Sequence, residues 1–281
     1  MFRLGTDFKA ARAGINYSAV SGQWWLTTVL FLLLQIVMLY FVQGLTAVAG
    51  YYFLTGSYPD FANLDAASMA ALAKASIVGM FPASIIMVAF AWWCTGLFNN
   101  TGDRGIPLHR PDMGSGGWLI TVGGVISFLY VTYMLTFYVL GIDPQTYAPT
   151  SGGVNDQASH SGMVEKTMAD LADEPLLFAL ALPAIILGAP LSEEFMFRGA
   201  LFSALRQSWF GKTGAVVITS ALWSLIHVAS APWLFVFGIF IMGLLLGWLL
   251  LRFGSLWVTI VVHAAWNAFS SLAIIGGVSG T

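Results

Sequence analysis

The chain has 281 residues, of which 58% are hydrophobic and only 9% are charged, with a mean hydropathy of +0.81. Because soluble domains carry roughly 25% charged residues, 11 basic and 13 acidic side chains are too few to cover a water-facing surface of this size, which excludes a soluble globular protein. The net charge of −2 offers no basic excess for binding phosphate, so the expected partner is the lipid bilayer rather than nucleic acid.

Long uncharged stretches predict an all-α fold, a polytopic bundle of transmembrane helices, since a spanning helix needs about 20 apolar residues. The stretch 213–251 is long enough for two helices, and Pro232 divides it. We expect seven spans, near 24–46, 76–98, 117–140, 176–197, 214–230, 233–251 and 255–276. The uncharged residues from 13 to 59 could also hold a re-entrant piece, which would make eight elements.

Four parts of the chain follow from these spans. Residues 1–23 form a cytoplasmic N-terminal segment, read as an interfacial helix, and 24–142 hold three spans. Residues 143–175 form an acidic extracytoplasmic loop, and 176–276 form a helical core that carries the candidate catalytic residues. Nine Lys and Arg residues fall on one side of the predicted membrane and two on the other. The positive-inside rule therefore predicts a cytoplasmic N-terminus.

Gly243 and Gly247 form a G-x-x-x-G pattern in the sixth span. Small residues at this spacing let another helix approach closely, so we expect them to pack inside the bundle.

An acidic pair lies where lipid-facing residues are expected. Pro190 is expected to break the preceding helix, and Ser192 to cap a new helical segment that begins here. Glu194 and Arg198 stand at positions i and i+4, a spacing that predicts a helical ion pair. Glu193 lacks such a partner at ideal spacing and is the better candidate for a general base. The alternative is that both acids only stabilise the helix and bind Arg198.

Two later spans carry polar groups at helical spacing. Trp223 and His227 are i and i+4, and so are His263 and Asn267. Each pair lies on one helical face, where it could serve only as a hydrogen-bonding link between helices. Together with the acids, however, these groups supply a base for water and donors for an oxyanion.

Water is the expected nucleophile. The chain has no G-x-S-x-G motif, and its one cysteine, Cys94, is not near a histidine in the sequence. Ideal helical rise places Glu193 closer to the inner face than His227 and His263, so a shared site requires the fourth span to be shifted, tilted or broken. A separation of more than about 10 Å between Glu193 and both histidines would exclude the shared site. Such groups must interact through a direct hydrogen bond of about 3 Å or through one bridging water.

The three motifs, Glu193-Glu194-x-x-x-Arg198, Trp223-x-x-x-His227 and His263-x-x-x-Asn267, resemble those of the CPBP family of intramembrane proteases. That family comprises CAAX prenyl-protein endopeptidases and bacteriocin-processing and immunity proteins of the Abi type, and the resemblance covers roughly residues 176–272. It implies an intramembrane endopeptidase in which Glu193, assisted by His227, activates water, while His263 and Asn267 stabilise the oxyanion.

In that comparison, Glu194, Arg198 and Trp223 have supporting roles. Trp223 stands where the family commonly has Phe, a change expected to affect substrate fit more than chemistry. The implied substrate is a membrane-associated protein or peptide, hydrophobic or lipidated, and the default location is a bacterial inner membrane. Two alternatives stay open: an immunity or peptide-binding protein of the same family, and a proton-coupled transporter, although the inverted repeats typical of transporters are not visible.

Metal dependence is a separate question, because the family is often classed as metalloproteases. Zinc could be held by Glu193, His227 and His263, which would leave an open position for water. The chain has no H-E-x-x-H motif, and the i+4 partner of His263 is Asn267, a poor zinc ligand. We therefore expect a site without a bound cofactor and keep zinc as the alternative.

Overall fold

The computed structural model describes residues 24–97, 106–141, 171, 174–206, 208–228 and 231–278, and every regular element among them is helical. The predicted all-α fold is therefore confirmed for this part of the chain. The interfacial helix expected within 1–23 and most of the acidic loop 143–175 lie outside the described residues.

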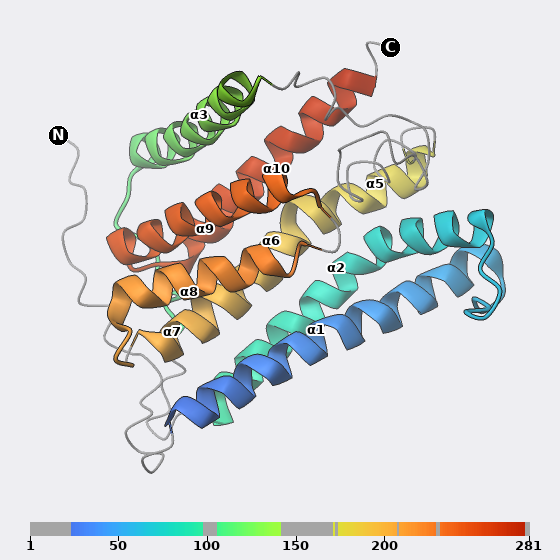
Figure 1. Ribbon diagram of the computed structural model, residues 1–281, viewed down its shortest axis with the longest axis horizontal. Helices are drawn as coiled ribbons and strands as arrows, with labels where there is room; N and C mark the ends of the chain where they lie inside the picture. The colour runs from blue at the N-terminus through green and yellow to red at the C-terminus, as the bar shows by residue number, and fades with distance from the viewer. Residues whose placement is uncertain are drawn as a thin grey trace.

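Two long helices form a hairpin along one side of the molecule. Helix α1 covers Trp24–Thr55 and α2 covers Ala66–Leu97, and they lie against each other along their lengths (Figure 1). The first helix ends at Gly56, whose φ of +74° places it in the left-handed region that favours glycine. The uncharged stretch forms a single helix from residue 24 to 55, without a re-entrant piece inside it.

The loop between these helices ends at a capping carboxylate. Asp65 Oδ1 accepts a hydrogen bond from the backbone N–H of Ser68 at 2.7 Å, at the start of α2. Hydrogen bonds from the side chain and then the backbone of Ser68 hold the pKa of Asp65 below its ordinary value. The cap explains why α2 begins about ten residues before the predicted span at 76.

A central helical segment packs on the other face of α2, and the remaining helices lie beyond that segment (Figure 1). Helix α3 covers Ser115–Leu140 and lies at the far edge, next to α9 and α10 (Figure 1). The central helical segment runs from Pro175 to Leu205, followed by α8 at Gly211–Leu225, α9 at Trp233–Phe253 and α10 at Leu256–Val278. The break expected at Pro232 is confirmed, since this residue directly precedes α9.

Within the described residues, five helices are long and apolar enough to cross a membrane. They begin at residues 29, 66, 115, 175 and 233. Their outer faces carry large exposed apolar side chains, as expected for contact with lipid, for example Phe53, Leu119 and Tyr138. Helix α8 has 15 residues, Gly211–Leu225, whereas the predicted span 214–230 has 17.

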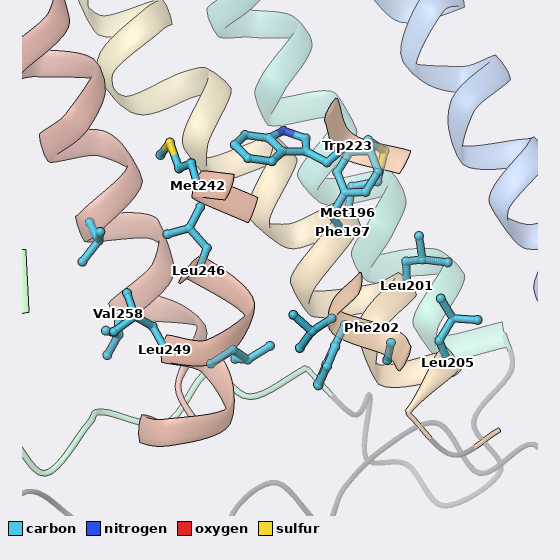
Figure 2. Packing of buried hydrophobic residues seen from close by; sticks show 14 of the residues in the cluster. Met196, Phe197, Leu201, Phe202, Leu205, Trp223, Met242, Leu246, Leu249 and Val258 are labelled. Atoms are coloured by element: carbon cyan, nitrogen blue, oxygen red, sulfur yellow. The ribbon is translucent and has the colours of Figure 1, made fainter. Parts of the chain in front are cut away.

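The buried core lies between the central segment and helices α8, α9 and α10 (Figure 2). One buried cluster contains Met196, Phe197 and Leu201 of the central segment, Trp223 of α8, Leu246 and Leu249 of α9, and Val258 of α10. This packing fixes the central segment against the helices that carry the histidines.

Gly243 and Gly247 make the close approach of α8 and α9 possible. A Cβ at Gly243 would lie 2.8 Å from Ser220 Cβ, and one at Gly247 would lie 2.7 Å from Val216 Cγ1. The expected packing role of the G-x-x-x-G pattern is confirmed.

Candidate active site

The central segment is one continuous helix that widens twice. It consists of α5 (Pro175–Pro183), the π-helical η4 (Ala184–Gly188), α6 (Ala189–Glu193), the π-helical η5 (Glu194–Leu201) and α7 (Phe202–Leu205). In a π-helix each N–H bonds to the carbonyl five residues back, and such widenings are frequent at functional sites. The two candidate acids stand at the junction of α6 and η5.

The expected helix break before these acids is wrong. Pro190 lies inside the helical path, and Ser192 is not a cap, because its hydroxyl donates back to the carbonyls of Gly188 and Ala189 at 3.1 Å each. The sequence expectation assumed α-helical register, in which Pro190 would clash with the preceding turn. The wider π-helical turn of η4 accommodates the proline instead.

The helix also continues further than predicted, to Leu205 rather than 197. Glu193 is therefore 12 residues from the end of the segment, about 18 Å along the axis at a rise of ~1.5 Å per residue. The longer helix places Glu193 in the interior of the bundle. A site that Glu193 shares with His227 and His263 therefore needs no break in the fourth span.

Glu194 is completely buried at the centre of a polar cluster. Its Oε1 accepts a hydrogen bond from Arg198 Nη1 at 2.9 Å and lies 3.0 Å from His263 Nδ1. Arg198 is also fully buried, and its Nη2 donates to the carbonyl of Gly243 at 3.4 Å. Breaking a buried ion pair leaves a charge without compensation. The pair that the i,i+4 spacing predicts is thus a part of the core.

Trp223 connects the members of this cluster. Its indole N–H donates to Glu193 Oε2 at 2.6 Å, and the guanidinium of Arg198 lies over the ring, 4.3 Å from its centroid. The edge contacts to the rings of His227 and His263 have centroid distances of 5.7 and 5.2 Å. Trp223 is among the largest fully buried side chains and packs near Met242 in Figure 2. Trp223 therefore contacts Glu193, Arg198, His227 and His263 at once.

His227 lies just beyond the end of α8, in a turn rather than on the helix. Its Nδ1 is 2.8 Å from the carbonyl of Trp223, one of the last carbonyls of the helix. Because a carbonyl can only accept, Nδ1 carries the proton, and in the neutral ring the lone pair is on Nε2.

The same reasoning applies to His263, on α10. The carboxylate of Glu194 accepts from its Nδ1, so Nε2 is the nitrogen that can gain or lose a proton. His263 Nε2 lies 4.0 Å from Glu193 Oε2, well inside the limit set above for a shared site. The structure thus brings together Glu193, Glu194, Trp223 and His263, with Arg198 beside them.

Asn267 has a different neighbour. Its Nδ2 donates a hydrogen bond to the backbone carbonyl of Ile185, in η4, at 2.9 Å. One of its two amide hydrogens is therefore used by the protein itself.

Sequence reasoning missed a segment between α2 and α3 that closes one end of the core. Ser255 Oγ donates to the carbonyl of His109 at 2.7 Å, and the backbone N–H of Leu256 donates to that of Pro107 at 2.8 Å. Trp257 Nε1 donates to the carbonyl of Leu108 at 2.9 Å. Three successive residues thus bind three successive carbonyls. In the sequence, the only sign of these bonds is the side-chain donors of Ser255 and Trp257.

The three side chains considered for zinc do not fit such a site as they are arranged. In the described part of the chain, no three His, Cys, Asp or Glu residues lie close enough to hold one metal ion. Glu193 Oε2 and His263 Nε2 are 4.0 Å apart, whereas two ligand atoms on one tetrahedral zinc are about 3.4 Å apart. Glu193 Oε2 also already accepts the indole hydrogen of Trp223.

The fold and the cluster define a multi-pass helical membrane protein with a buried carboxylate–histidine site. Residues 175–269, about a third of the chain, match the family model described as "Type II CAAX prenyl endopeptidase Rce1-like". The match confirms that this part of the chain resembles the CPBP and CAAX proteases. No curated protein and no solved structure matches the chain. The family supports an intramembrane protease of the CAAX type in general.

Proposed function

We propose that the protein is an endopeptidase that cleaves a membrane-associated peptide, hydrophobic or lipidated near the scissile bond, with water as the nucleophile. The observation that carries this proposal is the 4.0 Å separation between Glu193 Oε2 and His263 Nε2, inside the segment that matches the protease family. Two groups that can exchange protons are thus adjacent in a largely buried site.

Glu193 acts as the general base. Its Oε2 is fixed by the indole of Trp223, and Oε1 makes no hydrogen bond to the described residues, so it can accept a hydrogen bond from water. His227 assists through Nε2, the nitrogen that its bond to the Trp223 carbonyl leaves unprotonated. When water attacks the scissile carbonyl carbon, its proton passes to Glu193. When the C–N bond breaks, that proton passes to the leaving amine.

His263 and Asn267 stabilise the oxyanion. Protonated His263 donates from Nε2, and the carboxylate of Glu194 on Nδ1 compensates its charge. Asn267 contributes the amide hydrogen that is not bound to Ile185. No step in this scheme requires a metal ion. The scheme applies at a bacterial inner membrane with the N-terminus in the cytoplasm, as the distribution of basic residues predicts.

The experiment is a cleavage assay in proteoliposomes with purified protein. A fluorogenic peptide with a C-terminal CAAX sequence is offered with and without a farnesyl group on its cysteine, beside a prenylated peptide of scrambled sequence. The proposal predicts cleavage of the prenylated CAAX peptide, and none by E193A or H263A. The matched control is W248F, which changes a half-exposed residue of α9 and should cleave normally.

Two results would overturn the proposal. Cleavage that persists in both E193A and H263A would show that another site or a contaminant is responsible. Tight binding of the peptide without cleavage by the wild-type protein would favour the immunity or binding alternative.

A further inference from the structure

We infer that Asn267 is a positioning residue that replaces a backbone hydrogen bond which Pro190 removes, and so holds the acidic helix in register with His263. The inference rests on the proposed function for its catalytic consequence. Its structural part stands on the hydrogen bonds alone.

In η4, Pro190 deprives one backbone carbonyl of its helical partner. The N–H of Ala189 bonds to the carbonyl of Ala184, five residues back, as expected for a π-helix. In the same register, the carbonyl of Ile185 should receive the N–H of residue 190. That residue is Pro190, which has no N–H. The Ile185 carbonyl therefore loses its helical partner.

A side chain on α10 supplies the missing donor to the Ile185 carbonyl. In an apolar bundle an unpaired carbonyl is costly, and prolines in membrane helices are tolerated where neighbouring side chains satisfy the freed group. Asn267 Nδ2 donates to the Ile185 carbonyl at 2.9 Å, from a different helix. The proline and the asparagine thus form one unit, 77 residues apart in the sequence.

The bond from Asn267 to Ile185 joins the two helices that carry the candidate catalytic groups. Asn267 is one helical turn beyond His263 on α10, and Ile185 lies two turns before Glu193 and Glu194. The bonds from Asn267 to Ile185 and from His263 to Glu194 therefore clamp the same two elements at two points. Loss of the Asn267 clamp should let the acidic helix shift relative to His263.

The test is a double-mutant cycle between P190A and N267L. P190A supplies an N–H that can pair the Ile185 carbonyl in the π-helical register, and in an α-helical register the N–H of Ala189 would pair it, so P190A should remove the need for Asn267. The inference predicts that N267L lowers the melting temperature by several degrees in the wild-type background, and by less than about a third of that in P190A, since coupled residues are non-additive. Equal losses in both backgrounds would overturn it.

The catalytic readout separates positioning from direct oxyanion binding. A positioning role added to oxyanion binding predicts that N267L lowers kcat at least about tenfold more in the wild-type background than in P190A. A purely direct role predicts the same loss of kcat in both backgrounds, with no coupling in melting temperature. Because melting temperature is read without a substrate, the inference remains testable if the proposed function fails.

Two further variants keep the test sharp if P190A does not fold. N267D preserves the shape of the side chain and lacks the donor when it is ionised at high pH, so the inference predicts a melting temperature there as low as that of N267L. A melting temperature close to that of the wild type would show that packing alone matters. The matched control is S271A, one turn further along α10, where the buried hydroxyl bonds only to its own helix. It should change melting temperature and kcat little.

Discussion

The indole N–H of Trp223 donates a 2.6 Å hydrogen bond to Oε2 of Glu193. This bond joins the end of α8 to the acidic helix and fixes one carboxylate oxygen, which leaves the other free to face water. A phenylalanine, common at this position in the family, would preserve the ring but could not make the bond. We therefore propose that Trp223 orients the candidate base Glu193, in addition to the expected effect on substrate fit.

W223F should lower kcat with little change in KM. A hydrogen bond to a charged group contributes about 1.5–3 kcal/mol, which corresponds to roughly 10- to 100-fold in rate. Steady-state kinetics with the prenylated peptide measure this effect, and W248F makes the same chemical change at a half-exposed site. In an E193Q background, W223F should have no further effect on kcat. A large rise in KM at constant kcat would instead support the role in substrate fit.

R198M should destabilise the protein strongly. It leaves the Glu194 carboxylate buried without its cation, at an expected loss of about 3–5 kcal/mol. The double variant E194L/R198M should recover much of this stability, because it buries no charge. It should stay inactive, however, because His263 Nδ1 loses its acceptor. Thermal unfolding in detergent together with the cleavage assay tests both parts, and a double variant as unstable as R198M would contradict the argument.

Cleavage should withstand metal chelators, since the proposed scheme requires no metal ion and the arrangement of Glu193, His227 and His263 does not fit zinc. The assay is repeated after dialysis against a strong chelator and again after addition of one equivalent of zinc. Activity that disappears on dialysis and returns with zinc would overturn the metal-free scheme.

G254A should destabilise the corner between α9 and α10. Gly254 has a φ of +63°, where a Cβ costs about 1–2 kcal/mol. The corner directs Ser255, Leu256 and Trp257 toward the carbonyls of residues 107–109. The matched control is G238A in the interior of α9, where an added Cβ has no neighbour within 4 Å and alanine favours the helix. Equal melting temperatures for the two variants would show that the corner is not strained.

The fold was largely predictable because its signals are local. Uncharged stretches, Pro232 and the G-x-x-x-G pattern each act within one or two helical turns, and the spacing of Glu194 and Arg198 needs only helical geometry. The wrong step was the break at Pro190. Local rules assume α-helical register, whereas the register here is π-helical and depends on a donor from Asn267, on another helix.

The sequence was enough to name the candidate site residues but not to predict their arrangement. The motifs named Glu193, His227 and His263, but nothing in their spacing indicates that the Trp223 indole reaches Glu193. The backbone contacts of Ser255, Leu256 and Trp257 with 107–109 were also invisible, because carbonyl acceptors carry no sequence signal. Such contacts follow from tertiary packing, which sets where each helix end meets its neighbours.

The most direct test of the central claim is the cleavage rate of E193Q. Glutamine keeps the size of the side chain and an oxygen that can accept the Trp223 indole, but it cannot take a proton from water. We predict that E193Q unfolds at the wild-type temperature and binds the prenylated peptide with wild-type affinity. Its kcat should fall about 1,000-fold, in the middle of the 10²–10⁴-fold range that general acid–base catalysis typically contributes. A well-folded E193Q that cleaves within tenfold of the wild-type rate would contradict the assignment of Glu193 as the base.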